Sequence, residues 1–244
     1  MRPQKKISKL ATSEVLKRRD LAPDLWLMWI EKPDGYTFKP GQYCTIGVDG
    51  IERAYSIVSA PHEDALELFV EMVPEGGLTP KLSLLEIGDN VTIRPRAKGI
   101  FTMDPEFPNQ LMVSTVTGVV PYISFVRDYI HHNRDGHYIH LLQGASYQDE
   151  FAYDLELEAL IKQYPELLTY VPAVSRPHEE RNRGWSGETG RVNTIVERYI
   201  EELSLRPDDT MVYVCGHPGM IEDVKTKLLP RGFPLKEERF WKED

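Results

Sequence analysis

The segment QLMVSTVTGVVPYISFVRDYIHH, residues 110–132, joins an apolar strand, a short turn and a helix in direct succession. Its first seven residues form an apolar run, and the apolar positions after Pro121 follow the spacing of a helix. Proline suits the first turn of a helix, because its missing N–H would have no partner there. The segment therefore predicts a strand–turn–helix unit, which is a building block of α/β domains.

The same alternation continues to the end of the chain. Further strands and helices are predicted at residues 138–144, 151–164, 167–176, 191–203, 210–216 and 219–229, strand and helix in turn. Alternation of this kind is typical of a doubly wound parallel sheet. In such a sheet, ligands bind beyond the carboxyl ends of the strands.

The first hundred residues have a different pattern, in which short β-rich runs are separated by Gly, Pro and Asp. These runs lie at residues 24–35, 41–50, 52–61, 66–77 and 88–99, and one helical piece lies at 78–88. Strands at this spacing predict a small antiparallel β-barrel. We place the boundary near residues 98–109, which predicts a barrel domain at 1–103 and an α/β domain at 104–244.

The composition is that of a globular protein, with 41% hydrophobic and 27% charged residues. No apolar run approaches the length of a membrane span, and the basic N-terminus lacks the apolar segment of a secretory signal. We therefore expect a cytoplasmic protein. Cys44 and Cys215 lie far apart and form no CxxC pair, so we expect no metal or iron–sulfur site and no disulfide framework.

The formal net charge of −9 is unevenly distributed along the chain. Residues 1–100 carry 14 basic and 14 acidic residues, whereas the rest of the chain carries 15 basic and 24 acidic ones. This asymmetry indicates two units with different surfaces. Nucleic acid is not an expected partner of the acidic unit, because phosphate binding requires clustered cations.

Two strand ends in the α/β part could approach a nucleotide. In STVTGVVP, Thr117 and Gly118 could bring backbone N–H groups near a phosphate at the start of a helix, although an ordinary strand–helix turn explains the segment equally well. In YVCGHPGM, Cys215 and Gly216 end a strand, and a thiol there could touch the reacting edge of a nicotinamide. A buried cysteine is more often a small core residue.

A third strand end, at VSRP, carries a possible selectivity signal. Arg176, next to Ser175, stands where the adenosine ribose lies in folds of this kind. NAD sites usually hold a carboxylate there, whereas an arginine suits the 2′-phosphate of NADP. Arg191 at a helix start forms the second half of the pair. The alternative is that both are ordinary surface arginines.

The stretch RAYSIVS, residues 53–59, is polar for a barrel strand. Arg53 could balance a diphosphate and Tyr55 could stack on a flat aromatic ligand, while Ser56 points to the opposite face of a regular strand. The turn PEGGLTPKL, residues 74–82, is a second possible phosphate cradle, because its glycines leave backbone N–H groups exposed. The alternative explanation for the polar strand at residues 53–59 is that its hydroxyl groups simply face solvent.

Together, RAYS with a serine three residues on, GGLT, CGHPGM and an aromatic residue near the C-terminus resemble the ferredoxin–NADP reductase superfamily. The resemblance is closest to the short bacterial ferredoxin/flavodoxin–NADP reductases, and it extends from about residue 8 to Trp241.

This resemblance implies an FAD-binding antiparallel β-barrel followed by an NADP-binding doubly wound domain. It assigns Arg53 to the FAD diphosphate, Tyr55 to the isoalloxazine ring and Ser56 to a hydrogen bond near the flavin N5 that accepts hydride. The residues that it implies for FAD are Arg53, Ala54, Tyr55, Ser56, Gly76, Gly77, Leu78, Thr79, Phe240 and Trp241.

For NADP(H), the resemblance implies a site at the strand ends, with Ser56 and Cys215 as the catalytic residues and no metal. The residues that it implies for NADP are Thr117, Gly118, Ser175, Arg176, Arg191, Cys215 and Gly216. Two positions depart from the family pattern: Val116 replaces a glycine, and Ser146 stands where an arginine is common. Because a β-branched residue resists a positive φ, we expect either a different loop path or weaker nucleotide binding.

The expected function is hydride transfer between NADP(H) and flavin, with single electrons passing to or from ferredoxin or flavodoxin. The enzyme is expected to be a monomer that binds its carrier transiently and electrostatically. Such carriers are acidic, so we expect a basic docking face, for which a merely solvated surface is the alternative. The basic residues are Lys5, Lys6, Lys9, Lys17, Arg18, Arg19, Arg94, Arg96 and Lys98.

Two other functions stay open from the sequence. One is an NADH-linked flavin reductase that serves an oxygenase, a cytochrome or a free acceptor. The other is a flavin-binding electron-transfer or sensing module whose nucleotide site is spoiled by Val116.

Overall fold

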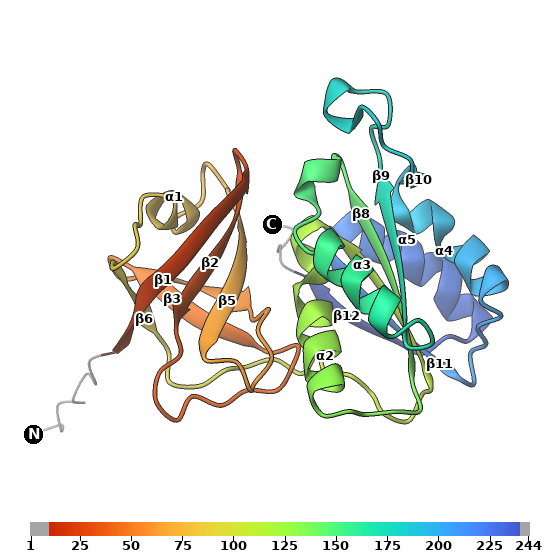
Figure 1. Ribbon diagram of the computed structural model, residues 1–244, viewed down its shortest axis with the longest axis horizontal. Helices are drawn as coiled ribbons and strands as arrows, with labels where there is room; N and C mark the ends of the chain where they lie inside the picture. The colour runs from red at the N-terminus through yellow and green to blue at the C-terminus, as the bar shows by residue number, and fades with distance from the viewer. Residues whose placement is uncertain (1–9, 240–244) are drawn as a thin grey trace, which may run out of the picture.

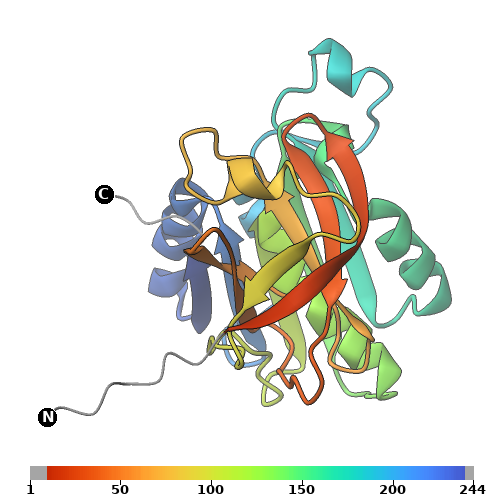
Figure 2. The same ribbon diagram turned by 90° about the vertical axis from the view of Figure 1, so that its left-hand side faces the viewer.

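The chain folds into two six-stranded sheets, one antiparallel and one parallel (Figure 1). The computed structural model describes residues 10–239. The antiparallel sheet has the strand order β4-β3-β6-β1-β2-β5 and curls around an apolar core, which confirms the predicted barrel (Figure 2). Its strands are β1 (Ala11–Ala22), β2 (Leu25–Glu31), β3 (Tyr43–Val48), β4 (Ile51–Ser56), β5 (Ala65–Glu71) and β6 (Asn90–Ile93).

Strand β1 corrects the sequence analysis, which predicts no strand before residue 24. Only two of its 12 residues are buried, so it lacks the alternation of apolar and polar residues that marks a strand. Lys17 and Arg18 lie over the rings of Trp29 and Trp26, at 4.4 and 4.9 Å from the ring centroids. Long charged side chains therefore cover the apolar surface of the neighbouring strand.

The predicted helix at residues 78–88 is much shorter in the structure. Helix α1 (Thr79–Leu82) has one turn and is capped by Ser83, whose backbone N–H donates to the carbonyl of Thr79. Pro80 lies in its first turn, where proline is tolerated. Leu82 of the helix and Leu78 just before it are buried in the barrel core, in the cluster that Ile51 and Tyr55 of β4 pack against.

The parallel sheet confirms the predicted doubly wound domain. Its order is β10-β9-β8-β7-β11-β12, and every neighbouring pair is parallel. The strands are β7 (Asn109–Thr115), β8 (Tyr138–Ala145), β9 (Leu168–Val174), β10 (Glu188–Thr189), β11 (Thr210–Gly216) and β12 (Leu235–Arg239). The helices are α2 (Val120–His131), α3 (Asp154–Gln163), α4 (Val192–Glu202) and α5 (Pro218–Leu228), and the single 3₁₀ turns are η1 (Val116–Val119), η2 (Gln148–Glu150), η3 (Glu180–Asn182) and η4 (Leu229–Arg231).

The helices cover both faces of this sheet (Figure 1). Residues of α2 and α3 pack against one face in a cluster with Met112 and Leu141. Residues of α4 and α5 pack against the other face, in a cluster with Val113 and Val214. Because both faces are buried, the central strands are continuously apolar, which is why the sequence identifies them so readily.

Two strands of this sheet were not predicted. Strand β10 has only two residues, and β12 has the sequence LKEER, in which no residue is fully buried. Both lie at the edges of the sheet, where one side of the strand has no neighbour and little apolar surface is needed. Strand β12 nevertheless becomes important, because it brings Glu238 to the candidate site.

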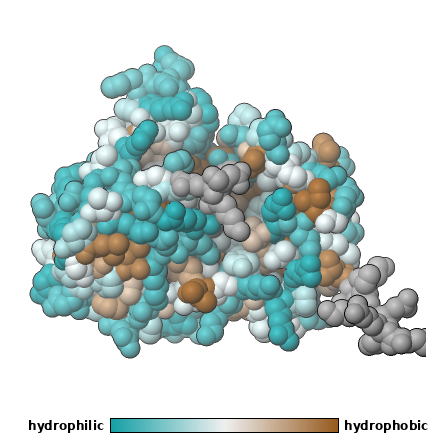
Figure 3. Space-filling view, turned by 180° about the vertical axis from the view of Figure 1, so that it is seen from behind, coloured by the Kyte–Doolittle hydropathy of each residue, from teal (hydrophilic) through white to brown (hydrophobic). Residues whose placement is uncertain are grey.

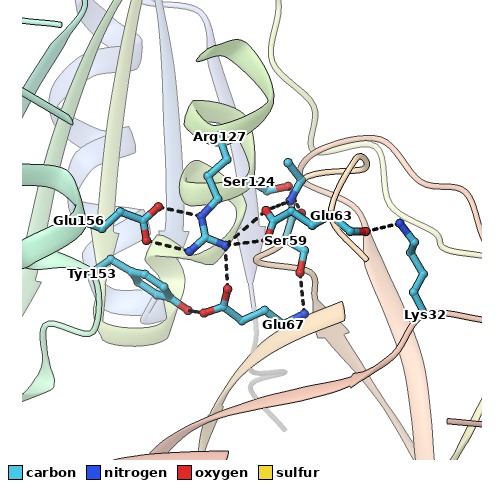
Figure 4. Close-up of polar contacts among 9 residues, drawn as sticks. Lys32, Ser59, Glu63, Glu67, Ser124, Arg127, Tyr153 and Glu156 are labelled. Carbon is cyan, nitrogen blue, oxygen red and sulfur yellow. Dashed lines mark hydrogen bonds and ion pairs between the residues drawn. The ribbon is translucent and has the colours of Figure 1, made fainter. Parts of the chain in front are cut away.

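The two sheets meet along helix α2. Leu27 and Phe69 of the barrel and Phe125 of α2 belong to one buried apolar cluster. Beside it, Arg127 of α2 bridges strand β5 and helix α3 by ion pairs with carboxylates from both (Figure 4). The predicted domain boundary falls between β6 and β7, and the limits 1–103 and 104–244 stay a prediction.

Among residues 10–239, no helix is both long and apolar enough to span a membrane. The face shown in Figure 3 is mainly hydrophilic, and its apolar residues gather in small separate patches. The most exposed large apolar side chains are Leu84, Ile87, Ile100 and Leu155.

Candidate active site

A cavity of about 550 Å³ opens beside strand β4, and we call it the barrel cavity. It brings together the residues predicted for FAD from two separate parts of the barrel. Those in its wall are Arg53, Ala54, Tyr55, Ser56, Gly76, Gly77, Leu78 and Thr79. The other two predicted residues, Phe240 and Trp241, lie outside the described residues 10–239.

Strand β4 can carry polar side chains because it is the edge of its sheet, paired only with β3. The guanidinium of Arg53 donates to the carbonyl of Glu52 at 2.8 Å and, within the described residues, forms no ion pair. Its charge is therefore available to an anion in the cavity. Burial, together with the nearby Cys44, raises the pKa of Tyr55, so this hydroxyl stays protonated.

The turn before α1 forms another part of the wall. A Cβ atom on Gly76 would lie 2.9 Å from the carbonyl oxygen of Val73, and one on Gly77 would lie 3.3 Å from Ile51 and 3.7 Å from Arg53. The hydroxyl of Thr79 donates to the carbonyl of Val73 and accepts from its N–H, both at 3.0 Å. Thr79 therefore holds the turn closed, and the glycines keep the wall free of side chains.

A carboxyl group that the sequence analysis missed faces strand β4. The hydroxyl of Ser56 donates to Oε2 of Glu238 at 3.2 Å, and both residues lie in the wall of the barrel cavity. Burial raises the pKa of Glu238 to about 7, although the bond from Ser56 lowers it. Glu238 lies in β12 opposite Cys215 of β11. No apolar pattern marks LKEER, so only its position after the last helix could have indicated a strand.

A second cavity, of about 540 Å³, lies beyond the carboxyl ends of strands β7, β8, β9 and β11, and we call it the sheet cavity. Of the residues predicted for NADP, its wall contains Thr117, Ser175, Arg176, Arg191 and Gly216. The location agrees with the general rule for ligands of doubly wound sheets.

Gly118 and Cys215 lie behind this wall and line neither cavity. Cys215 is fully buried, and burial raises the pKa of its thiol well above the usual range, so it is not a thiolate. A Cβ atom on Gly118 would lie 2.2 Å from the carbonyl oxygen of Cys215. The glycine thus lets η1 pack directly on the end of β11. The contact predicted between Cys215 and a nicotinamide stays a prediction.

At the other end of the sheet cavity, two arginines differ in their surroundings. Arg176 donates to the hydroxyl of Tyr147 at 2.8 Å and lies 3.7 Å from the carboxylate of Glu179. Arg191 stands at the start of α4 and forms no ion pair with any residue in the range 10–239. Ser146, the position where the family often has an arginine, also lines the cavity.

Val116 adopts a positive φ although a β-branched residue resists one, and the weaker nucleotide binding expected from this residue stays a prediction. Its φ is 41°, in the left-handed region, and its side chain lines the sheet cavity. It directly follows strand β7 and begins η1. The strand–helix turn therefore keeps a backbone conformation that favours glycine, even though the residue is valine.

The two cavities adjoin. Thr117 of η1 and Glu71 of β5 lie in the walls of both. Burial, followed by the nearby Asp24 and Glu150, raises the pKa of Glu71. Two elongated ligands, one in each cavity, would meet at these residues, which is the arrangement that a transfer between two bound molecules requires.

A barrel followed by a doubly wound domain, with adjoining cavities, is the architecture of a protein that brings two ligands together, and comparisons with known proteins identify it as an oxidoreductase. Residues 112–226 match the family model described as an oxidoreductase NAD-binding domain. A ferredoxin–NADP reductase of Pseudomonas aeruginosa is 32% identical, over 91% of this chain and 90% of its own length. A flavodoxin/ferredoxin–NADP reductase of Buchnera aphidicola subsp. Schizaphis graminum is 34% identical, over 71% of this chain and 67% of its own.

The fold comparison points the same way. A ferredoxin NADP⁺ reductase from Neisseria gonorrhoeae, solved with bound FAD and NADP, superimposes with a TM-score of 0.83 at 24% identity, covering 96% of this chain and 100% of that one. The chain belongs to the ferredoxin–NADP reductase family. The resemblance inferred from the sequence motifs is confirmed, and so is the prediction of an oxidoreductase enzyme.

Proposed function

We propose that this enzyme binds FAD in the barrel cavity and NADP(H) in the sheet cavity, and passes single electrons to or from a ferredoxin or flavodoxin. The observation that carries the proposal is the junction of the two cavities at Thr117 and Glu71. The family relatives, whose names include ferredoxin, flavodoxin and NADP, support it.

The barrel cavity fits FAD in its chemistry. The charge of Arg53, which forms no ion pair within residues 10–239, suits the diphosphate, and the bare backbone at Gly76 and Gly77 allows a close approach. The ring of Tyr55 offers a flat surface that a flavin can stack on. Bound FAD supplies hydride acceptance and one-electron release. We also assign Ala54, Leu78 and Thr79 to the walls, and the predicted roles of Phe240 and Trp241 stay predictions.

Ser56 and Glu238 add a proton-exchanging group to that cavity. With a pKa of about 7, Glu238 can hold or release a proton near neutral pH. The hydroxyl of Ser56 keeps the carboxyl group oriented toward β4. We therefore propose that the Glu238 carboxyl group, oriented by Ser56, exchanges protons with a ligand bound in the barrel cavity.

The sheet cavity fits NADP(H). Arg176 and Arg191 offer cationic groups for the phosphates at one end, and Ser175 adds a hydroxyl beside them. At the other end, Thr117 and Gly216 leave little side-chain bulk near the barrel cavity. A Cβ atom on Gly216 would lie 2.3 Å from the hydroxyl of Thr115, so only glycine fits there.

The described docking candidates reduce to a smaller set. Among them, Lys17 and Arg19 form no ion pair within residues 10–239, but Lys17 lies over the ring of Trp29 and Arg19 donates to the carbonyl of Ala152, and neither lines the barrel cavity. Arg94 is ion-paired with Glu52, and Arg18 with Asp20, so their charges are largely balanced. Arg96 and Lys98 are exposed and form no ion pair within residues 10–239. The backbone of Lys98 forms an antiparallel β-bridge with that of Tyr43, and Tyr43 lines the barrel cavity. We propose that an acidic carrier docks at Arg96 and Lys98. The monomeric state and the cytoplasmic location stay predictions.

The test is an anaerobic mix of the purified enzyme with NADPH, and separately with NADH, followed through the flavin absorbance. We expect bleaching that is much faster with NADPH than with NADH, and Arg176→Ala should reduce that difference. Equal or faster bleaching by NADH would instead identify the NADH-linked reductase. A flavin that neither nucleotide reduces would contradict the nucleotide site, and a colourless protein would contradict FAD binding.

A further inference from the structure

The backbone at Val116 is held in place by a side chain that lines neither cavity. The carbonyl oxygen of Val116 accepts a hydrogen bond from Nε2 of Gln143 at 3.2 Å. Gln143 lies in β8, is fully buried and does not line the sheet cavity. Its bond to Val116 therefore connects a buried amide with the wall of that cavity.

Gln143 is itself oriented by Tyr170 of strand β9. The hydroxyl of Tyr170 donates to Oε1 of Gln143 at 3.0 Å. Burial raises the pKa of Tyr170 well above its usual range, so the hydroxyl keeps its proton and remains a donor. The Gln143 amide can bond both neighbours in only one orientation. The backbone carbonyl of Val116 can only accept a hydrogen bond, so the NH₂ group of Gln143 must face Val116.

The opposite end of η1 is fixed by close packing. Gly118 rests so tightly on Cys215 that even a methyl group has no room. The position of η1 is thus set by β11 at Gly118 and by β8 at Val116. Between these two points lies Thr117, which lines both cavities. If the φ of Val116 relaxed to a negative value, η1 would turn relative to β7 and Thr117 would move.

We propose that Gln143, oriented by Tyr170, is a positioning residue for the nucleotide: it holds the left-handed backbone of Val116 and so keeps Thr117 at the junction of the two cavities. This inference rests on the proposed NADP(H) site. Without the bond, a β-branched residue gains by leaving the positive φ, whereas a glycine at the same position gains little. The effect of losing Gln143 therefore depends on which residue occupies position 116.

This dependence gives a double-mutant test. NADP⁺ is titrated into the FAD-loaded enzyme, and its Kd is read from the flavin difference spectrum, for wild type, Gln143→Met, Val116→Gly and the double variant. We expect Gln143→Met to raise the Kd about tenfold in the wild-type background and less than about twofold in the Val116→Gly background. FAD content is expected to stay close to that of wild type, because most of the barrel cavity wall comes from the barrel strands and the turn before α1.

Two variants sharpen the interpretation. Val116→Ala removes side-chain bulk but keeps a Cβ atom at a positive φ, so it should retain most of the dependence on Gln143. Tyr170→Phe removes only the hydroxyl that orients Gln143, and it should weaken NADP⁺ binding in the same direction as Gln143→Met. It also provides the measurement if Gln143→Met fails to fold.

Equal losses in the wild-type and Val116→Gly backgrounds would overturn the proposal, since they would show that Gln143 acts through general stability. No loss in either background would overturn it as well. If the wild-type enzyme gave no spectral response to NADP⁺ at all, the nucleotide site itself would be contradicted, and the proposed function would fail together with this inference.

Discussion

At the residue scale, the most informative pair is Ser56 and Glu238. These residues lie 182 positions apart in the chain, yet Oγ of Ser56 is 3.2 Å from Oε2 of Glu238. The polar character of RAYSIVS indicates a ligand, and that part of the site can be predicted from sequence. Glu238 could not be predicted, because the chemistry of a carboxylate depends on burial and burial is decided by the fold. Nothing in the letters KEER distinguishes Glu238, with a raised pKa, from Glu237, with a lowered one.

This contrast makes a prediction about pH. The pKa of Glu238 is raised from an ordinary value of 4.5 to about 7, so folding favours its protonated form. Its contribution to stability is full below pH 4.5 and is lost as the pH rises through 7, by on the order of 3 kcal/mol at most. Glu238→Gln should therefore lose less unfolding free energy between pH 5 and pH 8 than wild type does, as measured by urea unfolding without added FAD.

The matched control is Glu237→Gln on the same strand. Burial alone would raise the pKa of Glu237, but its hydrogen bonds with Lys225 and Arg239 outweigh burial and lower the pKa. Its stabilising contribution is present above pH 4.5 and is lost only on acidification below that value, so Glu237→Gln should leave the wild-type change in unfolding free energy between pH 5 and pH 8 unaltered. Identical pH profiles for the two variants would contradict the raised pKa of Glu238.

A second prediction at this scale concerns Arg53. Removing a charge-assisted contact to a diphosphate costs about 1.5–3 kcal/mol, or roughly a 10- to 150-fold rise in Kd. Arg53→Ala should therefore lose most of its FAD on gel filtration, as read from the ratio of flavin to protein absorbance. Arg94→Ala, which removes an exposed arginine already paired with Glu52, should keep it. Full retention of FAD by Arg53→Ala would refute the assignment.

At the scale of elements, the predictions succeed where a strand has an apolar or β-rich run between turn residues, and they fail where charged residues run along the strand. The strands between Asn109 and Gly216 that lie inside the sheet are continuous apolar runs, and their helices have regular spacing. Strands β1 and β12 carry charges along their length, so the period of two is hidden. The turn at η1 is predicted from the sequence, but its conformation, with a positive φ at Val116, could not be, because it depends on packing against β11.

That packing can be tested through Gly118. A methyl group there would lie 2.2 Å from the backbone of Cys215, and backbone cannot move aside as a side chain can. Gly118→Ala should cost about 1–3 kcal/mol of unfolding free energy, and it should weaken NADP⁺ binding because η1 is displaced. Gly219→Ala is the comparison for the free energy of unfolding, since its new methyl group would meet only the ring of His217 at 3.3 Å; because Gly219 lines the sheet cavity, NADP⁺ binding is not compared between the two variants. Similar losses of unfolding free energy in the two variants would contradict the role of the close contact between Gly118 and the backbone of Cys215.

At the scale of the whole molecule, one arginine joins the two domains. Arg127 donates to Glu67 of the barrel and to Glu156 of α3 at 2.7 Å, and Tyr153 donates to the other oxygen of Glu67 at 2.9 Å (Figure 4). The side chain of Glu67 is only 4% exposed. Such a network holds the barrel cavity against the sheet cavity, because each carboxylate belongs to a different part of the fold.

Breaking this network should destabilise the enzyme strongly. Arg127→Met leaves the buried carboxylate of Glu67 without its cation, which costs about 3–5 kcal/mol. Adding Glu67→Gln removes that charge and should restore part of the loss, as measured by thermal or urea unfolding. Arg206→Gln is the control, since its ion pairs with Asp208 and Asp209 are at the surface and should contribute little to stability. If Glu67→Gln lowered the stability of the Arg127→Met variant further, the unpaired charge of Glu67 would not be the cause of the loss.

The overall charge sets the last prediction, on the electron carrier. A chain with a net charge of −9 repels an acidic protein at long range, so attraction must come from a local basic face. Lys98→Glu next to the barrel cavity should therefore slow electron transfer to an oxidised carrier, or from a reduced one, about tenfold at low salt. Raising the ionic strength should reduce the difference in rate between the variant and wild type. Flavin reduction by NADPH should be the same in both proteins, because Lys98 does not line the sheet cavity. If added salt accelerated carrier reduction by the wild-type enzyme, repulsion by the acidic surface would dominate the encounter, and docking at Arg96 and Lys98 would be wrong.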